Sequence, residues 1–329
     1  MKVILLIACA LSCFLNGAIA ATPTATNVNV TKIWDAAPHN AFTDLIRHQN
    51  QWLCVFREGK AHVSPDGAIR VLRSPDGHTW TSAAILRDEK ADLRDPKITI
   101  AQDGRLMLTA AAALPPPTET KHQTKVWFSA DGKTWTESVD IGDPNVWLWR
   151  VAWHKGKAYG VGYATAGDKF VRLYTSQDGR KFDPLVSTLF NEGYPNEAAL
   201  VFDSNDRGYC LLRRDGEAPS AKLGTAAPPY TKWEWKDLKA KIGGPQMLLL
   251  PDGRFVAGLR LYDGKVRTSI AWVDPQTGQL TEVAKLPSSG DSSYPGMVWH
   301  EGKLWMSYYS SHEGKSSIYL ARVELPKGS

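Results

Sequence analysis

The sequence predicts an all-β protein: a six-bladed β-propeller built from four-stranded antiparallel blades. Two repeated patterns support this prediction, a short turn motif that occurs three times and an apolar hairpin that occurs six times. In addition, no amphipathic helix of any length interrupts these repeats. Four strands in each unit of roughly 40 to 50 residues is the sequence signature of a propeller.

The turn motif reads Ser-x-Asp-Gly, followed by two residues and an aromatic residue. Its three copies begin at Ser74, Ser129 and Ser176, and each lies between two short β-rich runs. Asp-Gly between such runs indicates a hairpin turn, because glycine adopts positive φ without strain and the aspartate accepts backbone N–H groups. We therefore expect these aspartates to stabilise turns and to take no part in chemistry.

The hairpin pattern consists of two apolar strands around a polar turn. Clear copies lie at 98–108, 151–159, 247–256 and 297–306, and looser copies lie at 45–56 and 198–212. Because a further strand pair follows each copy, the predicted blades span 40–88, 92–142, 145–190, 194–240, 243–286 and 290–325. The early run 28–34 is expected to complete the last blade and close the ring.

The first twenty residues have the features of a secretion signal. Lys2 precedes an apolar stretch at 3–15, and Ala18-Ile19-Ala20 matches the small-x-small cleavage pattern. The stretch 6–9 resembles a lipoprotein box but lies too near the start to favour that interpretation. We expect cleavage after Ala20, a secreted or periplasmic protein, a single domain over 21–329 and no membrane span.

Composition and charge exclude several classes of function. The net charge of +5 comes from scattered basic residues, so no nucleic-acid partner is expected. Cys54 and Cys210 lie in apolar runs, which predicts buried free thiols. The eight histidines show no metal-ligand spacing, and phosphate-binding glycine loops are absent, so neither a metal nor a cofactor is expected. The thirteen tryptophans suit sheet packing or stacking on sugar rings.

The Ser-x-Asp-Gly-x-x-Trp repeat resembles the Asp box, or BNR repeat, of sialidases and related exo-glycosidases, and the resemblance extends over 21–329. It implies a propeller that holds a carbohydrate substrate at the mouth of its axis. In this family a tyrosine nucleophile is activated by a glutamate, an aspartate acts as acid and base, and three arginines grip a carboxylate. The tyrosine nucleophile is an exception among glycosidases.

Three positions match the family's catalytic set. Tyr294 opens the sixth blade where the family carries its nucleophile, and Glu197 opens the fourth blade on the matching glutamate-bearing strand. Asp66 lies in a stretch that resembles the one bearing the acid/base aspartate. A phenol has a pKa near 10, so a carboxylate is needed to accept its proton during attack. Asp66 would protonate the leaving oxygen and later activate water.

Two arginines match the family's clamp for an anionic group. Arg213 and Arg260 end equivalent strands of neighbouring blades. The sequence departs from the family at 42–45, where the first arginine is missing, and at 307–312, where the glutamate that braces it is missing. Arg57 ends its strand in register with Arg213 and is expected to supply a replacement cation. We expect these three arginines to converge with Glu197 and Tyr294 on one cup.

Further polar residues open or close inner strands and are expected to line this cup. As substrate-binding residues the sequence indicates Asp44, Arg94, His62 and His312. Other residues at comparable positions are Glu58, Asp95, Arg150 and Asp291, and either Trp147 or Trp149 could stack on a sugar.

The sequence therefore favours an exported exo-glycoside hydrolase that acts on a terminal acidic sugar. The alternatives are a lyase acting on a uronic acid, with His62 or His312 and a tyrosine, and a non-catalytic glycan-binding propeller. The departures at 42–45 and 307–312 favour these alternatives, whereas retention of Glu197, Tyr294 and two strand-end arginines favours the hydrolase.

Overall fold

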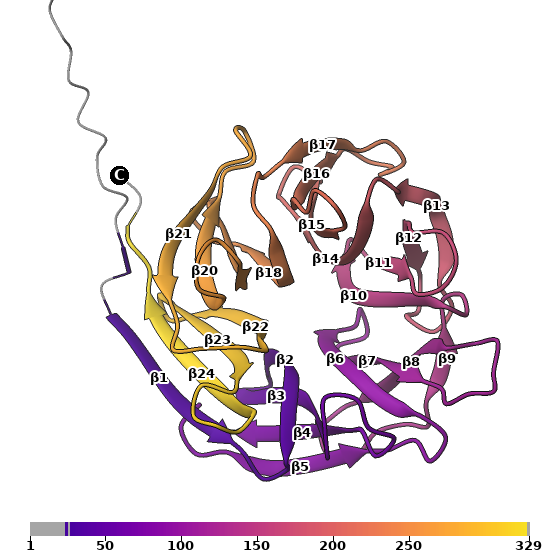
Figure 1. Ribbon diagram of the computed structural model, residues 1–329, viewed down its shortest axis with the longest axis vertical. Coiled ribbons are helices and arrows are strands. Elements are labelled where there is room, and N and C mark those ends of the chain that lie inside the picture. Colours follow the sequence, from indigo (N-terminus) through magenta and orange to yellow (C-terminus); the bar gives the residue numbers. More distant parts are fainter. Residues whose placement is uncertain (1–23, 26, 328–329) are drawn as a thin grey trace, which may run out of the picture.

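The computed structural model describes residues 24–25 and 27–327, so the predicted secretion signal lies outside the described residues. Within them, β-strands form six four-stranded antiparallel sheets arranged around a central axis (Figure 1). The predicted fold class is confirmed. Across these residues we find no helix with the length and apolar character needed to cross a membrane.

Five blades are formed by consecutive strands that run from the axis outward. The first three contain β2 (His39–His48), β3 (Gln51–Gly59), β4 (Ala68–Ser74), β5 (Thr81–Leu86); β6 (Asp92–Ile100), β7 (Leu106–Ala113), β8 (His122–Ser129), β9 (Val139–Ile141); β10 (Val146–His154), β11 (Lys157–Ala164), β12 (Val171–Ser176) and β13 (Asp183–Phe190). The next two contain β14 (Tyr194–Phe202), β15 (Gly208–Asp215), β16 (Lys222–Ala226), β17 (Glu234–Asp237); β18 (Ile242–Leu249), β19 (Phe255–Leu261), β20 (Arg267–Val273) and β21 (Leu280–Lys285).

The sixth blade combines the two ends of the chain. It contains β22 (Ser292–His300), β23 (Lys303–Ser310), β24 (Ser317–Glu324) and, at its outer edge, β1 (Asn27–Trp34). β1 pairs with β24 from Asn27 opposite Glu324 to Trp34 opposite Ile318. The run 28–34 therefore closes the ring as predicted, and Figure 1 shows the indigo first strand beside the yellow last one.

The three turn motifs share one hydrogen-bond pattern. In the first, Asp76 Oδ1 accepts the backbone N–H groups of His78 at 2.8 Å and Thr79 at 2.9 Å, and Ser74 Oγ accepts that of Gly77 at 2.8 Å. The motifs at Ser129 and Ser176 repeat these bonds. Each motif uses its polar atoms to hold the turn, which is a structural role.

Each innermost strand carries a bulge near its first residues, where the strand has one residue more than its partner. A bulge re-aims side chains locally. The residues within the six bulges include Phe42, Asp95, Trp149, Glu197, Gly244 and Tyr294. Since the innermost strands surround the axis, the bulges bring one residue from each blade towards the same axial end.

Cys54 and Cys210 are free thiols buried in the sheets, as the sequence predicts. Burial raises the pKa of both thiols above the range in which they ionise. Neither sulfur is therefore a nucleophile at neutral pH.

Candidate functional site

Tyr294 and Glu197 form a short hydrogen bond at the axial mouth. The Tyr294 hydroxyl donates to Glu197 Oε1 at 2.7 Å. Arg213 Nη1 donates to the other carboxylate oxygen, Oε2, at 2.8 Å and to the Tyr294 hydroxyl oxygen at 3.1 Å. Three residues from the fourth and sixth blades thus form one cluster of charged and polar atoms.

The backbone around Tyr294 is held in an uncommon conformation. Ser293 and Tyr294 both have positive φ, at 83° and 50°, and such strain in residues other than glycine gathers at functional sites. Gly244 packs against the Tyr294 ring so closely that a Cβ there would lie 2.7 Å from a ring carbon. The Gly244 N–H donates to Glu197 Oε2 at 2.8 Å, so this glycine positions both members of the pair.

The environment gives the two groups the protonation states that nucleophilic attack requires. Burial raises the pKa of Tyr294 well above its usual value, with the negative charge of Glu197 adding to the effect, so the phenol is neutral. Burial would raise the pKa of Glu197 as well, but the charge and hydrogen bonds of Arg213 and the bonds from Tyr294 and Gly244 hold it below its usual value. Glu197 is therefore an ionised acceptor for the phenolic proton.

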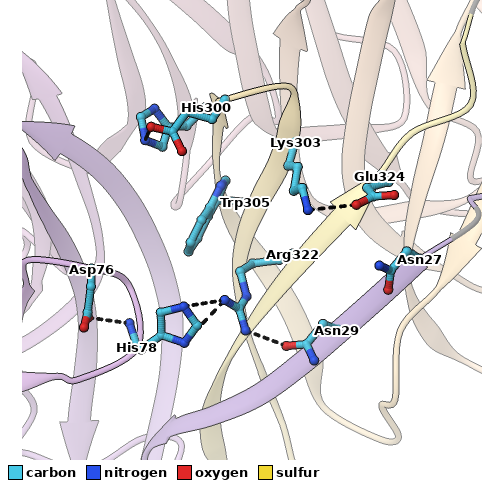
Figure 2. Close-up of a pocket in the computed structure, with 10 residues that line it drawn as sticks. Asn27, Asn29, Asp76, His78, His300, Lys303, Trp305, Arg322 and Glu324 are labelled. Carbon is cyan, nitrogen blue, oxygen red and sulfur yellow. Dashed lines mark hydrogen bonds and ion pairs between the residues drawn. The ribbon is translucent and has the colours of Figure 1, made fainter.

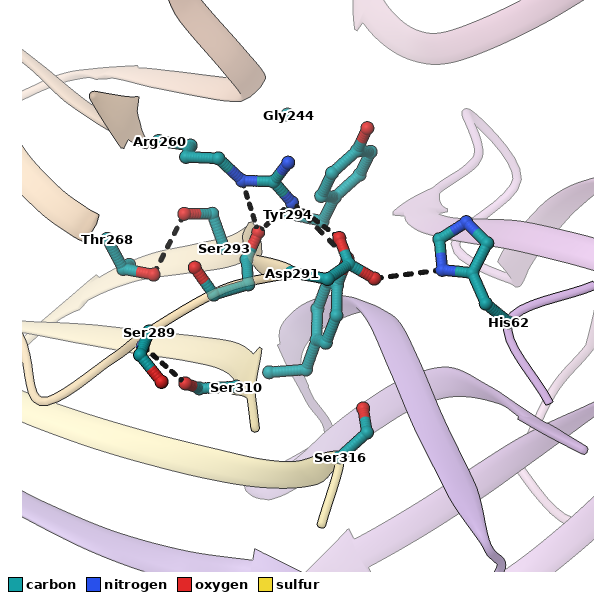
Figure 3. A network of polar contacts seen from close by, with 12 residues as sticks. His62, Gly244, Arg260, Thr268, Ser289, Asp291, Ser293, Tyr294, Ser310 and Ser316 are labelled. Carbon is teal, nitrogen blue, oxygen red and sulfur yellow. Dashed lines mark hydrogen bonds and ion pairs between the residues drawn. The ribbon is translucent and has the colours of Figure 1, made fainter. Parts of the chain in front are cut away.

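Arg260 approaches the same tyrosine from the fifth blade. Its guanidinium carbon lies 5.4 Å from the centroid of the Tyr294 ring. Nε donates to the Ser292 carbonyl at 2.9 Å. Nη2 donates to Asp291 Oδ1 at 2.9 Å (Figure 3). Arg213 is also ion-paired, through Nη2 to Asp215 Oδ2 at 2.9 Å. The structure thus brings together four of the five residues expected to share one cup.

Arg57 differs from the expectation because its side chain has no exposed surface. Nε donates to Asp92 Oδ1 at 2.7 Å, Nη1 to the Ala61 carbonyl at 2.9 Å and Nη2 to Ser64 Oγ at 3.1 Å. The guanidinium holds the turn that follows β3 against the second blade. A buried cation with these partners is not presented to a substrate, so Arg57 is structural.

Asp44 is likewise buried and does not present its carboxylate to a ligand. Its Oδ2 accepts Arg150 Nη1 at 2.8 Å and the Ile98 N–H at 2.9 Å. These bonds link the first three blades around the axis. Because the carboxylate is occupied by protein donors, the predicted substrate contact of Asp44 is corrected to a structural role.

Asp66 does not have the properties of a general acid. The side chain is exposed, and its Oδ1 accepts the Lys60 N–H at 3.3 Å. Burial acts to raise the pKa of Asp66, but the hydrogen bonds from Ser64 and Lys60 together outweigh it and keep this pKa below its usual value. A general acid needs the opposite shift.

Asp95 has the buried environment that a general acid requires. It lies in the β6 bulge with φ of 48°, is 5% exposed, and its Oδ1 has no hydrogen-bond partner among the described residues. Burial raises the pKa of Asp95 to about 6 despite the opposing charges of Lys97 and Arg94. The charge of Glu197 acts to raise the pKa of Asp95, and the charge of Asp95 acts to raise the pKa of Tyr294, so Asp95 lies near the pair. In the sequence Asp95 was only one of several cup-lining residues, because its burial leaves no local signal.

The remaining expected ligands occupy different places. The Arg94 guanidinium carbon lies 5.4 Å from the centroid of the Phe42 ring, which in turn lies 5.2 Å from the ring centroids of both His62 and Tyr294. Arg94 and His62 therefore border the Tyr294 cluster. His312 packs on β24, the third strand of the sixth blade, through Tyr319, with ring centroids 4.8 Å apart.

The tryptophans expected to stack on a sugar are packed against protein side chains. Trp149 is 2% exposed, and its ring centroid lies 5.7 Å from that of Tyr294. Trp147 stacks on Tyr163 with ring centroids 5.7 Å apart. Both therefore support the wall behind Tyr294 and offer no open face to a ligand.

A separate cavity of about 330 Å³ lies between the first and sixth blades (Figure 2). Its wall includes Trp305 and His300, which lie at the end of the blade opposite to Tyr294. Arg322 crosses it and pairs with His78 Nε2 at 2.6 Å and Asn29 Oδ1 at 2.8 Å. This cavity shares no lining residue with the Tyr294 cluster.

The sequence matches no family model and no curated protein. Among solved structures it is similar to a protein of unknown function from Dyadobacter fermentans, with a TM-score of 0.79 and 19% identity over 91% of this chain and 99% of that one. It is also similar to an α-L-arabinanase from Penicillium chrysogenum complexed with arabinobiose, with a TM-score of 0.66 and 13% identity over 91% and 98% of the two chains.

A third similar structure is the Trypanosoma rangeli sialidase in complex with sialic acid, with a TM-score of 0.68 and 12% identity. That alignment covers 92% of this chain and 60% of the sialidase. At such identities the similarity concerns the fold. The chain therefore has the six-bladed propeller fold of the sialidases and arabinanases.

Proposed function

We propose that the protein is a glycoside hydrolase that removes a terminal sugar from a glycan, with Tyr294 as its nucleophile. The observation that carries this proposal is the 2.7 Å hydrogen bond from the neutral Tyr294 phenol to the ionised, buried Glu197. The glycosidases among the structural neighbours, which act on different sugars, support a hydrolase on this scaffold.

In the first step the Tyr294 oxygen attacks the anomeric carbon while its proton passes to Glu197. Asp95 in its acid form donates a proton to the oxygen of the breaking glycosidic bond, so the aglycone leaves as a neutral alcohol. In the second step Asp95 takes a proton from water, the water oxygen attacks the anomeric carbon, and the phenol leaves and regains its proton from Glu197. Each group returns to its starting state.

An acidic terminal sugar is the finer part of the proposal. Arg213 Nη1 lies 3.1 Å from the Tyr294 hydroxyl, and the Arg213 side chain is 18% exposed. An anionic substituent beside the anomeric carbon would gain a charge-assisted bond there. Against this, both Arg213 and Arg260 already have acidic partners, which lowers the positive potential that they offer. A neutral sugar is therefore the direct rival within the same mechanism.

Export is also part of the proposal, supported by the apolar stretch at 3–15 and the cleavage pattern that ends at Ala20. A secreted or periplasmic protein would encounter glycans outside the cytoplasm. A lyase using His62, and a glycan-binding propeller without activity, are the alternatives that the experiment below distinguishes.

The test is a hydrolysis screen of the purified protein on aryl glycosides and oligosaccharides ending in sialic acid, uronic acid or arabinose. We expect release of the terminal sugar, and a loss of turnover of at least about a thousandfold in Tyr294→Phe, because the attacking atom is gone. Glu197→Gln should be comparably impaired. The double variant should be no worse than the single ones, since both groups serve one step.

Tyr308→Phe is the matched control, because Tyr308 lies on the neighbouring strand β23 and its hydroxyl donates to the Pro287 carbonyl at 3.0 Å. It should keep full activity. A fully active Tyr294→Phe protein would eliminate the nucleophile assignment. Products carrying a new double bond would identify a lyase, and glycan binding without any turnover would identify a binding module.

A further inference from the structure

Three potential metal ligands lie together beside the cup, although they are far apart in the sequence. His39 opens β2, His62 follows β3, and Asp291 precedes β22. One ligand atom from each lies within 4.8 Å of the other two. Ring closure between the first and sixth blades produces this arrangement, which explains why no ligand spacing is visible in the sequence.

We propose that His39, His62 and Asp291 bind a divalent transition-metal cation, for which zinc is the best-matched example. Two imidazoles and one carboxylate are a ligand set that suits zinc and its neighbours in the first transition row, whereas calcium and magnesium prefer oxygen ligands alone. The inference concerns binding and does not depend on the proposed hydrolase activity.

The geometry of the three side chains is close to that of a three-ligand site. His62 Nδ1 lies 2.8 Å from Asp291 Oδ2, and the rings of His39 and His62 have centroids 5.4 Å apart (Figure 3 shows the His62–Asp291 contact). Ligand atoms of a tetrahedral zinc site lie about 3.4 Å apart. The upper limit of 4.8 Å exceeds this value by about 1.4 Å, and His62, whose side chain is 49% exposed, has room to move by that amount.

The second carboxylate oxygen of Asp291 is already fixed by protein donors. Oδ1 accepts the Tyr309 hydroxyl at 2.6 Å and Arg260 Nη2 at 2.9 Å. These bonds orient Oδ2 towards His62 Nδ1, and a cation would replace the proton that these two atoms share. Outer-shell partners orient ligands in metal sites in the same way. The Arg260 charge weakens the affinity for a cation, but it acts on the opposite oxygen.

His39 has a ring nitrogen that no protein group satisfies among the described residues. Its Nδ1 is buried and has no hydrogen-bond partner among the described residues. An unpartnered buried nitrogen is costly unless some group satisfies it. The exposed side of His62 and Asp291 leaves room for water or another oxygen ligand in the remaining coordination positions.

Isothermal titration calorimetry with Zn²⁺ on the untagged protein, after treatment with a chelator, tests the proposal. We expect one Zn²⁺ per chain and a rise in melting temperature with added Zn²⁺. His62→Ala and His39→Ala should each weaken binding by at least about tenfold and abolish the rise. Mg²⁺ should bind far more weakly than Zn²⁺ in the wild type.

His154→Ala is the control. His154 also contacts an aspartate, with Nε2 3.0 Å from Asp206 Oδ1, but it does not belong to the three-residue cluster. It should bind Zn²⁺ as the wild type does. The proposal is overturned if the wild type binds no Zn²⁺ at millimolar concentration, if His62→Ala and His39→Ala bind it unchanged, or if His154→Ala loses it. His62→Ala alters an exposed residue, so a folding failure of His39→Ala leaves the test intact.

Discussion

Asp95 and Glu197 are buried carboxyl groups near one tyrosine, and their pKa values move in opposite directions. Glu197 is held below its usual pKa because Arg213, Tyr294 and the Gly244 N–H all stabilise its charge against the effect of burial. Asp95 lacks a hydrogen-bond partner for Oδ1 among the described residues, so burial dominates and raises its pKa to about 6. At a pH between the pKa of Glu197 and that of Asp95, Glu197 is ionised and Asp95 carries a proton. A base and an acid need this division of protonation states.

This difference has a measurable effect on stability. The pKa of Asp95 is higher in the folded protein, about 6, than in the unfolded chain. Its contribution to the free energy of unfolding is therefore present at pH 4 and is lost as the pH rises through 6. The amide introduced by Asp95→Asn would bear no charge at any of these pH values. We therefore expect the stability of Asp95→Asn relative to the wild type to increase as the pH rises from 4 to 7, by an amount on the order of 3 kcal/mol.

Urea unfolding of both proteins at pH 4 and pH 7 measures this gain. Asp66→Asn is the control, because hydrogen bonds lower the pKa of Asp66 and the variant should show no gain over the same interval. A stability difference between wild type and Asp95→Asn that is independent of pH would refute the raised pKa.

At this scale the sequence predicted some residues of the cluster and missed others for identifiable reasons. Tyr294 and Glu197 could be located because each opens an innermost strand of a recognisable repeat. Arg57 had the same strand-end placement as Arg213, but its partners Asp92 and Ser64 come from other segments, and only the folded chain reveals that they enclose it. Placement along a strand predicts which end a residue reaches, whereas exposure depends on neighbours distant in sequence.

At the scale of elements, the turn motifs lock neighbouring blades together as well as forming turns. A Cβ at Gly132 would lie 2.4 Å from Leu53 Cδ2 in β3, and one at Gly77 would lie 2.4 Å from Trp305 in β23. Each glycine thus packs on the second strand of the preceding blade. The repeat requires glycine both for its positive φ and for this close approach.

Gly132→Ala should therefore destabilise the protein more than the loss of a turn glycine alone. Positive φ costs an alanine about 1 kcal/mol, and the clash with Leu53 adds on the order of 2 kcal/mol. Gly104→Ala isolates the first contribution, because Gly104 has φ of 82° and a Cβ added there would meet no atom within 4 Å. Denaturant unfolding compares the two. Equal losses of stability would show that the contact between blades is unimportant.

Strand positions followed from the apolar hairpins, but the bulges of the innermost strands did not. Regular alternation assigns every second side chain of a strand to one face of the sheet. The extra residue of a bulge changes the face to which the neighbouring side chains point. Asp95 and Trp149 lie in such bulges. Their orientation therefore depends on strand register, which a single sequence does not specify.

At the scale of the molecule, the axial end is organised by buried polar contacts between blades. Arg150 of the third blade forms an ion pair with Asp44 of the first. Glu197 of the fourth blade is paired with Arg213 of the same blade and accepts a hydrogen bond from Tyr294 of the sixth. A buried pair that loses one partner leaves an uncompensated charge. The geometry of the cup is therefore tied to the ring remaining closed, and closure depends on the β1–β24 pairing.

Removal of residues 24–35 should destabilise the whole ring. The deletion leaves β24 as an unpaired edge and removes Val30, Ile33 and Trp34, which pack on the cores of the sixth and first blades. At about 1 kcal/mol for each partly buried side chain, the free energy of unfolding should fall by on the order of 3 kcal/mol. Thermal and urea unfolding measure the loss, and size-exclusion chromatography detects association through the new edge.

A synthetic peptide covering residues 24–36 provides the control for this deletion. Added to the shortened protein, it should pair with β24 and raise the melting temperature in a concentration-dependent way, because it binds the folded state alone. A scrambled peptide of the same composition should have no effect. If the shortened protein melts at the same temperature as the full chain, β1 is not needed for closure, and the buried polar contacts at the axial end hold the ring without it.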